Sequence, residues 1–171
     1  MSMQLDKVQP KNKTQLKQLI NYAFKHNIYD LNFIDTSEIT DMSLLFSHCM
    51  HNFDVSSWDV SNAINMVYLF YHCKNFNCDL SNWDVSKVKN MNYMFYNCKN
   101  FNCDLSNWDM SKALRINEMF YGCKNFEGKG LENWKLEKTL FYYDIFTGCD
   151  KVKLPSWYKA FLKRCNLEFF K

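Results

Sequence analysis

The chain of 171 residues contains little glycine and little proline. Four Gly and two Pro are too few for an all-β protein whose tight turns depend on glycine. An excess of one charge is also missing, because 21 Lys and Arg are interspersed with 18 Asp and Glu and the net charge is +3. This balance argues against a nucleic-acid-binding surface, so we expect no nucleic-acid partner.

Long apolar runs are absent as well. No window approaches 18 apolar residues, so the sequence predicts no membrane span. The N-terminal segment Met1–Lys7 is polar and lacks the apolar stretch of a secretory signal. We therefore expect a cytoplasmic protein as the sequence is written, or a surface or secreted protein if a leader has been removed.

Catalytic signatures are the third absence. The chain has no G-x-G-x-x-G, no phosphate-binding loop motif and no H-E-x-x-H. Its four histidines occupy positions that repeat poorly and have no reliable nucleophile beside them: His26, His48, His51 and His72. The sequence thus predicts a protein that is not an enzyme and that needs no cofactor.

The chain is rich in apolar and aromatic residues. Hydrophobic residues make up 47% of it, with 15 Phe, 10 Tyr and 5 Trp, which excludes intrinsic disorder. At this length the chain is one domain with a substantial core.

A repeat of 25 residues is the dominant pattern. The segments Cys73–Cys98 (CKNFNCDLSNWDVSKVKNMNYMFYNC) and Cys98–Cys123 (CKNFNCDLSNWDMSKALRINEMFYGC) are nearly identical. Two further series keep the same register, the tryptophans Trp58, Trp83, Trp108 and Trp134, and the phenylalanines Phe46, Phe70, Phe95, Phe120 and Phe146. Each of these phenylalanines stands three residues before a cysteine. About five copies of one structural unit are therefore predicted over residues 31–149.

Each copy has the pattern of a strand followed by a helix. The cadence Leu80-x-x-Trp83-x-Val85 is typical of the short strand of a leucine-rich repeat. Ser86 then offers a helix N-cap, and the apolar spacing from Val88 onward is that of one helical face. The predicted fold class is α/β, a leucine-rich-repeat-like solenoid of about five strand-helix repeats with helical caps at both ends.

The two ends of this single repeat domain, residues 1–171, depart from the repeat. Residues 1–30 are predicted to form an N-terminal cap with a helix from about Thr14 to His26. Residues 150–171 are predicted to form a C-terminal cap, in which Pro155-Ser156-Trp157 opens a helix that continues through Arg164. Such caps cover the core that a terminal repeat would otherwise expose.

The repeat unit resembles a known family. The pattern N-W-D-V-S-x-V-x-x-M-x-x-M-F-x-x-C-x-x-F-N-x-D-L, which Asn82–Leu105 match nearly throughout, resembles the repeat of BspA-type bacterial surface proteins, also abundant in mycoplasma lipoproteins. The resemblance covers residues 31–149. It implies a leucine-rich-repeat-like solenoid and a role in protein interaction, adhesion or host contact, and it carries no catalytic motif.

The eight cysteines allow several readings. Five lie on the predicted apolar helix face, where a reduced cysteine acts as a small hydrophobic residue: Cys49, Cys73, Cys98, Cys123 and Cys149. A disulfide between Cys78 and Cys103 is an alternative. Another is a zinc or redox site formed by Cys73, Cys78, Cys98 and Cys103.

Polar residues beside each Trp are the first candidates for binding a partner. The predicted strand places them outward: Asp59, Asn82, Asp84, Asn107 and Asp109. Stacked aspartates would repel one another, so each carboxylate needs a compensating contact. A local turn in which Asp accepts from the N–H two residues on is one possibility. A basic partner is the second and a calcium ion the third.

Tyrosines on the predicted helix are the second set of candidates: Tyr68, Tyr93, Tyr96 and Tyr121. Aromatic residues are enriched at interfaces, although the flanking tyrosines can also pack between successive helices. We expect a protein–protein interaction module with a protein partner. The alternatives are a host-contact adhesin or surface antigen, and a cysteine-based metal-binding or redox-responsive protein.

Overall fold

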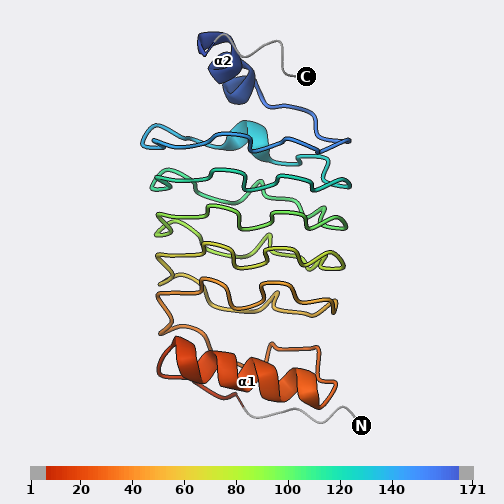
Figure 1. Ribbon diagram of the computed structural model, residues 1–171. Coiled ribbons are helices and arrows are strands. Elements are labelled where there is room, and N and C mark those ends of the chain that lie inside the picture. The colour runs from red at the N-terminus through yellow and green to blue at the C-terminus, as the bar shows by residue number, and fades with distance from the viewer. Residues whose placement is uncertain (1–6, 166–171) are drawn as a thin grey trace.

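The computed structural model describes residues 7–165 and shows a stack of similar coils with a helix at each end (Figure 1). The helices are α1 (Lys13–Lys25), a short 3-10 helix η1 (Leu131–Asn133) and α2 (Ser156–Arg164). Within the described residues no run is long enough to form a named strand. Successive coils are instead joined by isolated parallel bridges: Asp41 to Asn65, Asn65 to Asn90, Asn90 to Arg115, and Arg115 to Phe141.

The terminal helices lie where the sequence predicts helices. At the start of α1 the Asn12 side chain accepts a hydrogen bond from the Gln15 N–H, which satisfies a donor that the helix leaves free. Helix α1 buries Leu16, Ile20 and Ala23 against the first coil. Helix α2 is shorter and buries only Tyr158. Residues 1–6 and 166–171 of the predicted caps lie outside the described residues.

The predicted strand-helix repeat is wrong. Where a helix was expected, the chain forms two consecutive turns, Met91–Met94 and Phe95–Cys98, each closed by a hydrogen bond from the fourth N–H to the first carbonyl. The third residue of each turn, Tyr93 or Asn97, has a positive φ of 59° or 57°. This is the backbone of a type II turn. The expected strand is likewise interrupted, because Leu80–Trp83 is a turn, and Ser86 caps no helix.

The spacing of apolar residues led to the wrong prediction of a helix, because a helix and a series of turns bury residues at the same positions. In each tight turn the first and fourth residues point inward, so that buried residues recur three or four apart, as on a helix face. Met91, Met94, Phe95 and Cys98 are all buried. The pattern therefore predicted burial correctly and backbone conformation wrongly.

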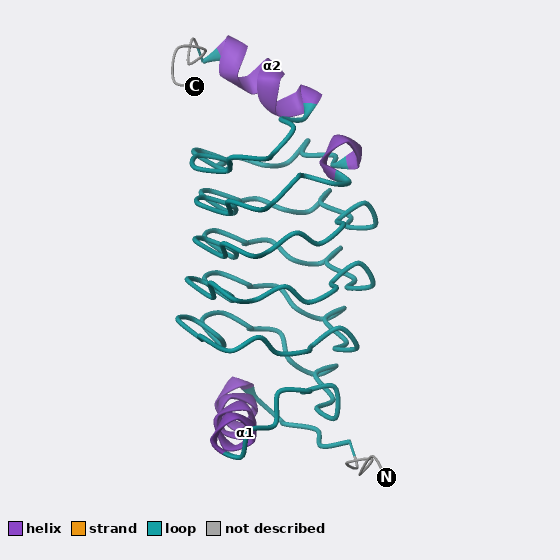
Figure 2. Cartoon of the chain, turned by 90° about the vertical axis from the view of Figure 1, so that its right-hand side faces the viewer, coloured by secondary structure: helices purple, strands orange, loops and turns teal. Residues whose placement is uncertain are grey.

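Hydrogen bonds between coils take the place of those within a helix. The N–H groups of Tyr93, Phe95 and Asn97 donate to the carbonyls of Asn117, Met119 and Tyr121 in the next coil, at 2.9, 2.9 and 2.7 Å. The same pattern joins the coils below and above, which accordingly lie in register in Figure 2. Alternate N–H groups of this segment thus bond to the neighbouring coil, and those between them close the turns.

Columns of aromatic rings fill the interior. The phenylalanine column stacks with centroid separations of 5.6, 5.4, 5.5 and 5.9 Å along Phe46, Phe70, Phe95, Phe120 and Phe146. The tryptophans form a second column, in which each indole N–H donates to a backbone carbonyl of the preceding coil. Trp83 donates to Val55 at 3.1 Å. One continuous core therefore runs through the stack.

The scarcity of glycine does not exclude turns in this fold. Left-handed backbone conformations are adopted by tyrosine, histidine and asparagine, among them Tyr68, His48 and His72. Such conformations cost roughly 1–3 kcal/mol for a non-glycine residue, and the bonds between coils hold them in place. Two of the four glycines, Gly122 and Gly148, occupy the places where the His48–His72 column continues.

Candidate functional site

Five tyrosines form one continuous surface on the side of the stack where the consecutive turns lie. We call Tyr68, Tyr71, Tyr93, Tyr96 and Tyr121 the tyrosine face. Tyr68 stacks on Tyr93 with centroids 4.7 Å apart and an interplanar angle of 4°. In the second row Tyr96 lies between Tyr71 and Tyr121, at 5.1 and 4.7 Å. The rows meet edge to face, with Tyr68 and Tyr71 at 5.0 Å.

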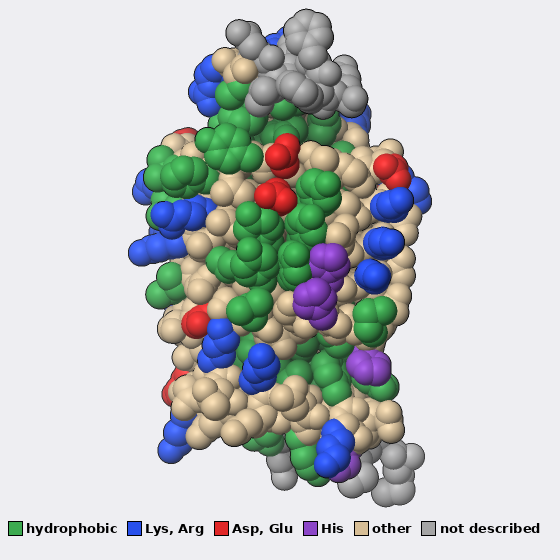
Figure 3. Space-filling model, in the orientation of Figure 1, with side chains coloured by type: hydrophobic (Ala, Val, Ile, Leu, Met, Phe, Trp, Pro, Cys, Tyr) green, Lys and Arg blue, Asp and Glu red, His purple; other side chains and the backbone are tan. Residues whose placement is uncertain are grey.

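The turns explain why these side chains point outward. Tyr93 is the third residue of one turn and Tyr96 the second residue of the next, and these middle positions face away from the core while the turn ends face inward. Coils joined by a parallel ladder lie about 4.8 Å apart, which matches the separation of stacked rings. All five side chains are half-buried. Figure 3 shows green side chains, the class that includes tyrosine, gathered in the middle of the face that it draws.

The phenols of Tyr68, Tyr93 and Tyr96 stay protonated at neutral pH. Burial against neighbouring side chains raises the pKa of Tyr68, Tyr93 and Tyr96 above the ordinary value. The Glu118 carboxylate raises the pKa of Tyr93 further. Glu118 occupies the position of Tyr93 in the next coil, so the first tyrosine row ends in an acid. The face therefore offers hydroxyl groups as donors and acceptors above an apolar body.

Two histidines border the tyrosine face, and they occupy equivalent positions, contrary to the sequence analysis. The rings of His48 and His72 stack at 5.0 Å and 13°, and Asn97 continues their column with its Nδ2 3.4 Å from His72 Nε2. Burial, helped by His48 and Lys74, lowers the pKa of His72. The sequence does contain a signal of this equivalence, because each histidine directly precedes a cysteine of the repeat, Cys49 or Cys73.

The aspartates beside the tryptophans make local turns. The carboxylates of Asp59, Asp84 and Asp109 accept from the backbone N–H two residues on, at Ser61, Ser86 and Ser111, over 2.9, 3.0 and 2.9 Å. The predicted Asx-turn is therefore confirmed. The hydroxyl and N–H of Ser86 lower the pKa of Asp84, so its charge is stabilised within its own coil.

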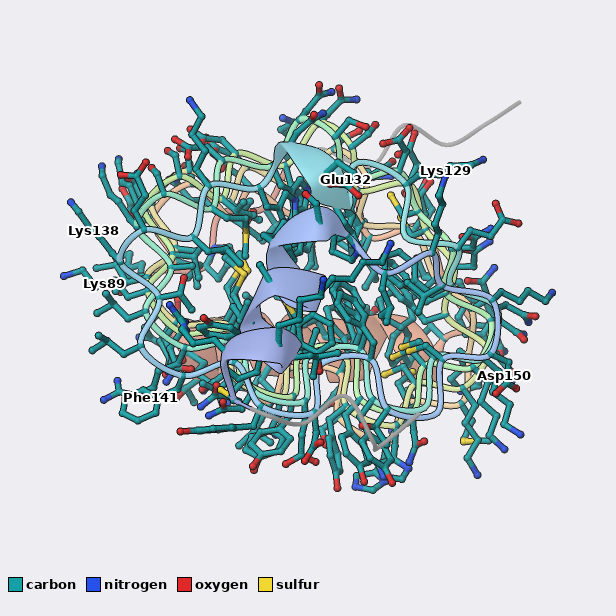
Figure 4. The ribbon with its side chains drawn as sticks, turned by 90° about the horizontal axis from the view of Figure 1, so that it is seen from above. Lys89, Lys129, Glu132, Lys138, Phe141 and Asp150 are labelled. Carbon is teal, nitrogen blue, oxygen red and sulfur yellow. The ribbon has the colours of Figure 1, made fainter. Side chains whose placement is uncertain are left out.

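The asparagines before the tryptophans lie away from the tyrosine face. Asn82 and Asn107 are exposed, and Asn107 Nδ2 donates to the Ser81 carbonyl at 3.4 Å. Asn133 occupies the same place in its coil as Asn82 and Asn107, and Glu132 directly precedes it. In Figure 4, Glu132 lies on a different side of the stack from Phe141, which borders the tyrosine face. The residues predicted as partner-binding thus fall into two separate groups.

All cysteines within residues 7–165 are free thiols, as expected for buried reduced cysteines, and the alternative Cys78–Cys103 disulfide is not formed. Four thiols donate to the phenylalanine carbonyls of the preceding coil, as Cys98 does to Phe70 at 2.9 Å. The Cys78 thiol lies 3.4 Å from a carboxylate oxygen of Asp54. No group of three or more His, Cys, Asp or Glu in the described part of the chain is placed to hold a metal ion.

These features define a repeat protein of stacked, turn-built coils with an ordered aromatic face. Over residues 14–134 the chain matches the family described as "Mycoplasma protein of unknown function, DUF285", and it belongs to that family. We found no match among curated proteins and none among solved structures. No helix between residues 7 and 165 has the length and apolar character needed to cross a membrane.

Proposed function

We propose that this protein is a protein-interaction module and that the tyrosine face is its contact surface. The observation that carries the proposal is the pair of adjoining stacked rows, which hold five half-buried tyrosines in fixed positions. Ordered aromatic side chains lose little conformational entropy when a partner covers them, and they bury a large area. The partner would be a protein with a surface complementary to both rows.

A binding role is also supported by the chemistry of the side chains nearby. Burial raises the pKa of Cys73 and Cys98 well above that of a reactive thiol. The stacked histidines have no activated nucleophile among the contacts of the described residues. We therefore propose a non-enzymatic role. The resemblance of the 25-residue unit to BspA-type repeats supports a narrower version, contact with a host surface.

Photo-crosslinking tests which of the two predicted groups meets the partner. A photoreactive phenylalanine analogue replaces Tyr96 in one variant and Asn107 in another, and each protein is irradiated in extract of the native cell. We expect one discrete protein adduct from position 96 and none from position 107. Adducts from position 107 alone would assign binding to the Asp and Asn group and contradict the proposal.

Affinity measurements with the identified adduct then test the energetics. The double variant Tyr93→Ser and Tyr96→Ser is expected to weaken binding at least about tenfold, since interface aromatics often contribute more than 1 kcal/mol each. The control Asn82→Ser and Asn107→Ser leaves the affinity unchanged. Equal effects of both pairs would argue against a tyrosine-specific contact.

A further inference from the structure

An exposed apolar loop borders the tyrosine face near the C-terminal end of the stack. Leu140, Phe141 and Tyr143 are 67, 38 and 55% exposed. Eight large apolar side chains are exposed in the described residues, and three of them lie within these four consecutive positions. Such clustering is uncommon on a soluble surface and indicates a contact site.

The backbone of the stack places cationic side chains beside this loop. A column of hydrogen bonds runs from Leu140 N–H to the Leu114 carbonyl and from Leu114 N–H to the Lys89 carbonyl, at 3.0 and 2.8 Å. Lys89 therefore lies two coils from Leu140 in the same column. The Arg115 guanidinium lies over the Phe141 ring, 5.5 Å from its centroid. Lys138 stands two residues before Leu140.

Within residues 7–165 these cations form no ion pair. The salt bridges among the described residues are Lys13 with Asp41 and Lys129 with Glu127, and neither involves Lys89, Arg115 or Lys138. In Figure 4 the side chains of Lys89, Lys138 and Phe141 project outward on one side of the stack. We call Lys89, Arg115, Lys138, Leu140, Phe141 and Tyr143 the basic apolar corner.

Glu137 and Asp144 flank the corner in sequence, and the Glu118 N–H donates to the Tyr143 carbonyl. A longer column of acidic side chains lies elsewhere. Asp54, Asp79 and Asp104 occupy equivalent positions in successive coils, and the column continues at Lys129, whose carbonyl accepts from Leu105 N–H. Figure 4 shows Lys129 on the side of the stack away from Phe141. A negatively charged surface that approaches the corner is therefore attracted without strong repulsion from this acidic column.

We propose that the basic apolar corner binds the surface of a membrane that contains anionic lipids. Lysine and arginine would contact lipid phosphates, while Leu140 and Phe141 would enter the boundary between headgroups and acyl chains. A protein hot spot needs a matching packed pocket. Outward-pointing apolar side chains between long cationic ones suit a fluid surface that adapts to them. This inference does not depend on the proposed role of the tyrosine face.

Vesicle sedimentation with the full chain tests the proposal. The probes are vesicles of phosphatidylglycerol mixed with phosphatidylcholine, and vesicles of phosphatidylcholine alone. We expect binding to the mixed vesicles that weakens as salt is added, because salt screens exposed charges, and little binding to the neutral ones. Equal binding to both vesicles, or binding to neither, would overturn the proposal.

Two variants of equal charge localise the contact. Lys89→Gln with Lys138→Gln is expected to weaken binding about 25-fold, at roughly fivefold per lysine. Lys99→Gln with Lys124→Gln removes the same charge from the column that continues at Asp150, on the opposite side in Figure 4, and should change binding less than about threefold. Similar losses from both pairs would show that only net charge matters and would overturn the proposal.

An uncharged substitution tests the apolar part. Leu140→Ser leaves the charge unchanged and is expected to weaken vesicle binding about tenfold, because a leucine buried at the interface is lost. Its thermal unfolding should match that of the parent, since Leu140 is exposed. Unchanged vesicle binding by Leu140→Ser would contradict insertion. The Tyr93→Ser and Tyr96→Ser variant should bind vesicles normally, which separates this test from that of the tyrosine face.

Discussion

At the scale of single residues, the tryptophan column contributes to stability in two ways. Trp83 fills the core, and its indole N–H satisfies the Val55 carbonyl of the preceding coil. Trp58, Trp108 and Trp134 repeat this bond with Leu31, Leu80 and Leu105. Each tryptophan therefore joins two coils by packing and by a buried hydrogen bond.

Substitutions at Trp83 separate these two contributions. Trp83→Ala should lower the free energy of unfolding by about 3–5 kcal/mol because it leaves a large cavity. Trp83→Phe should cost about 1–3 kcal/mol, chiefly because the buried Val55 carbonyl loses its donor. Denaturant unfolding measures both. Tyr93→Ala is the comparison and should cost only about 1 kcal/mol. If Tyr93→Ala lowered the free energy of unfolding as much as Trp83→Ala, the outward orientation of the Tyr93 side chain would be contradicted.

What the sequence could predict is clearest at this scale. Apolar periodicity correctly identified Trp83, Phe95 and Cys98 as buried, and side-chain chemistry correctly predicted the turn at Asp84. It could not reveal the positive φ of Tyr68 or Tyr93, because nothing local favours that conformation in a tyrosine. Bonds to the next coil impose it, and those bonds are not visible in the spacing of one repeat.

At the scale of structural elements, the turn replaces the helix as the unit of each repeat. Residues three apart, such as Tyr93 and Tyr96, are neighbours on a helix as well, but in the consecutive turns their rings lie 6.1 Å apart at 57°. The two rows therefore followed from the 25-residue spacing of the tyrosines in the sequence, and the way the rings are presented on the surface required the turn geometry. The buried cysteines are a second feature that repeats with the turns, since they close successive turns at Cys73, Cys98 and Cys123.

The buried thiols predict loss of stability at alkaline pH. Burial raises the pKa of Cys103 to about 11 and of Cys78 to about 12, and that of Cys98 well above the ordinary value of 9.0. The pKa of each thiol is higher in the folded protein than in the unfolded chain. Its contribution to stability is therefore complete below the pKa in the unfolded chain and is lost as the pH rises toward the pKa in the folded protein. The free energy of unfolding should therefore fall above about pH 9, by up to about 1.4 kcal/mol per pH unit for each such thiol.

Denaturant unfolding at a series of pH values up to about 10, where tyrosines begin to ionise, tests this dependence. Cys98→Ala should reduce the slope by about one proton relative to the parent. Cys165→Ala is the matched control, because Cys165 is exposed and should not change the slope. A stability that does not vary between pH 8 and pH 10 would refute the assignment of buried neutral thiols.

At the scale of the whole molecule, each coil contacts its neighbours in the stack through the same set of bonds and columns. Carbonyls of one coil accept from the coil before it, and the phenylalanine, tryptophan and cysteine columns continue across every boundary. In such an array, stability is close to a sum of unit and neighbour terms. Removing one complete coil should therefore leave a shorter protein whose remaining coils stay in register.

Deletion of residues 74–98 tests this expectation, because it removes 25 residues and joins Cys73 to Lys99, which reproduces the original Cys-Lys-Asn sequence. Both terminal helices lie outside the deleted coil, so circular dichroism should show an unchanged number of helical residues. Unfolding should remain cooperative, with a lower midpoint because one interface between coils is lost.

Deletion of residues 74–85 shifts every column out of register and should prevent folding. The shorter protein keeps Tyr68, Tyr71 and Tyr121 but lacks Tyr93 and Tyr96, so it should bind the crosslinked partner more weakly. If instead both deletions abolish folding, the coils depend on more than their neighbours.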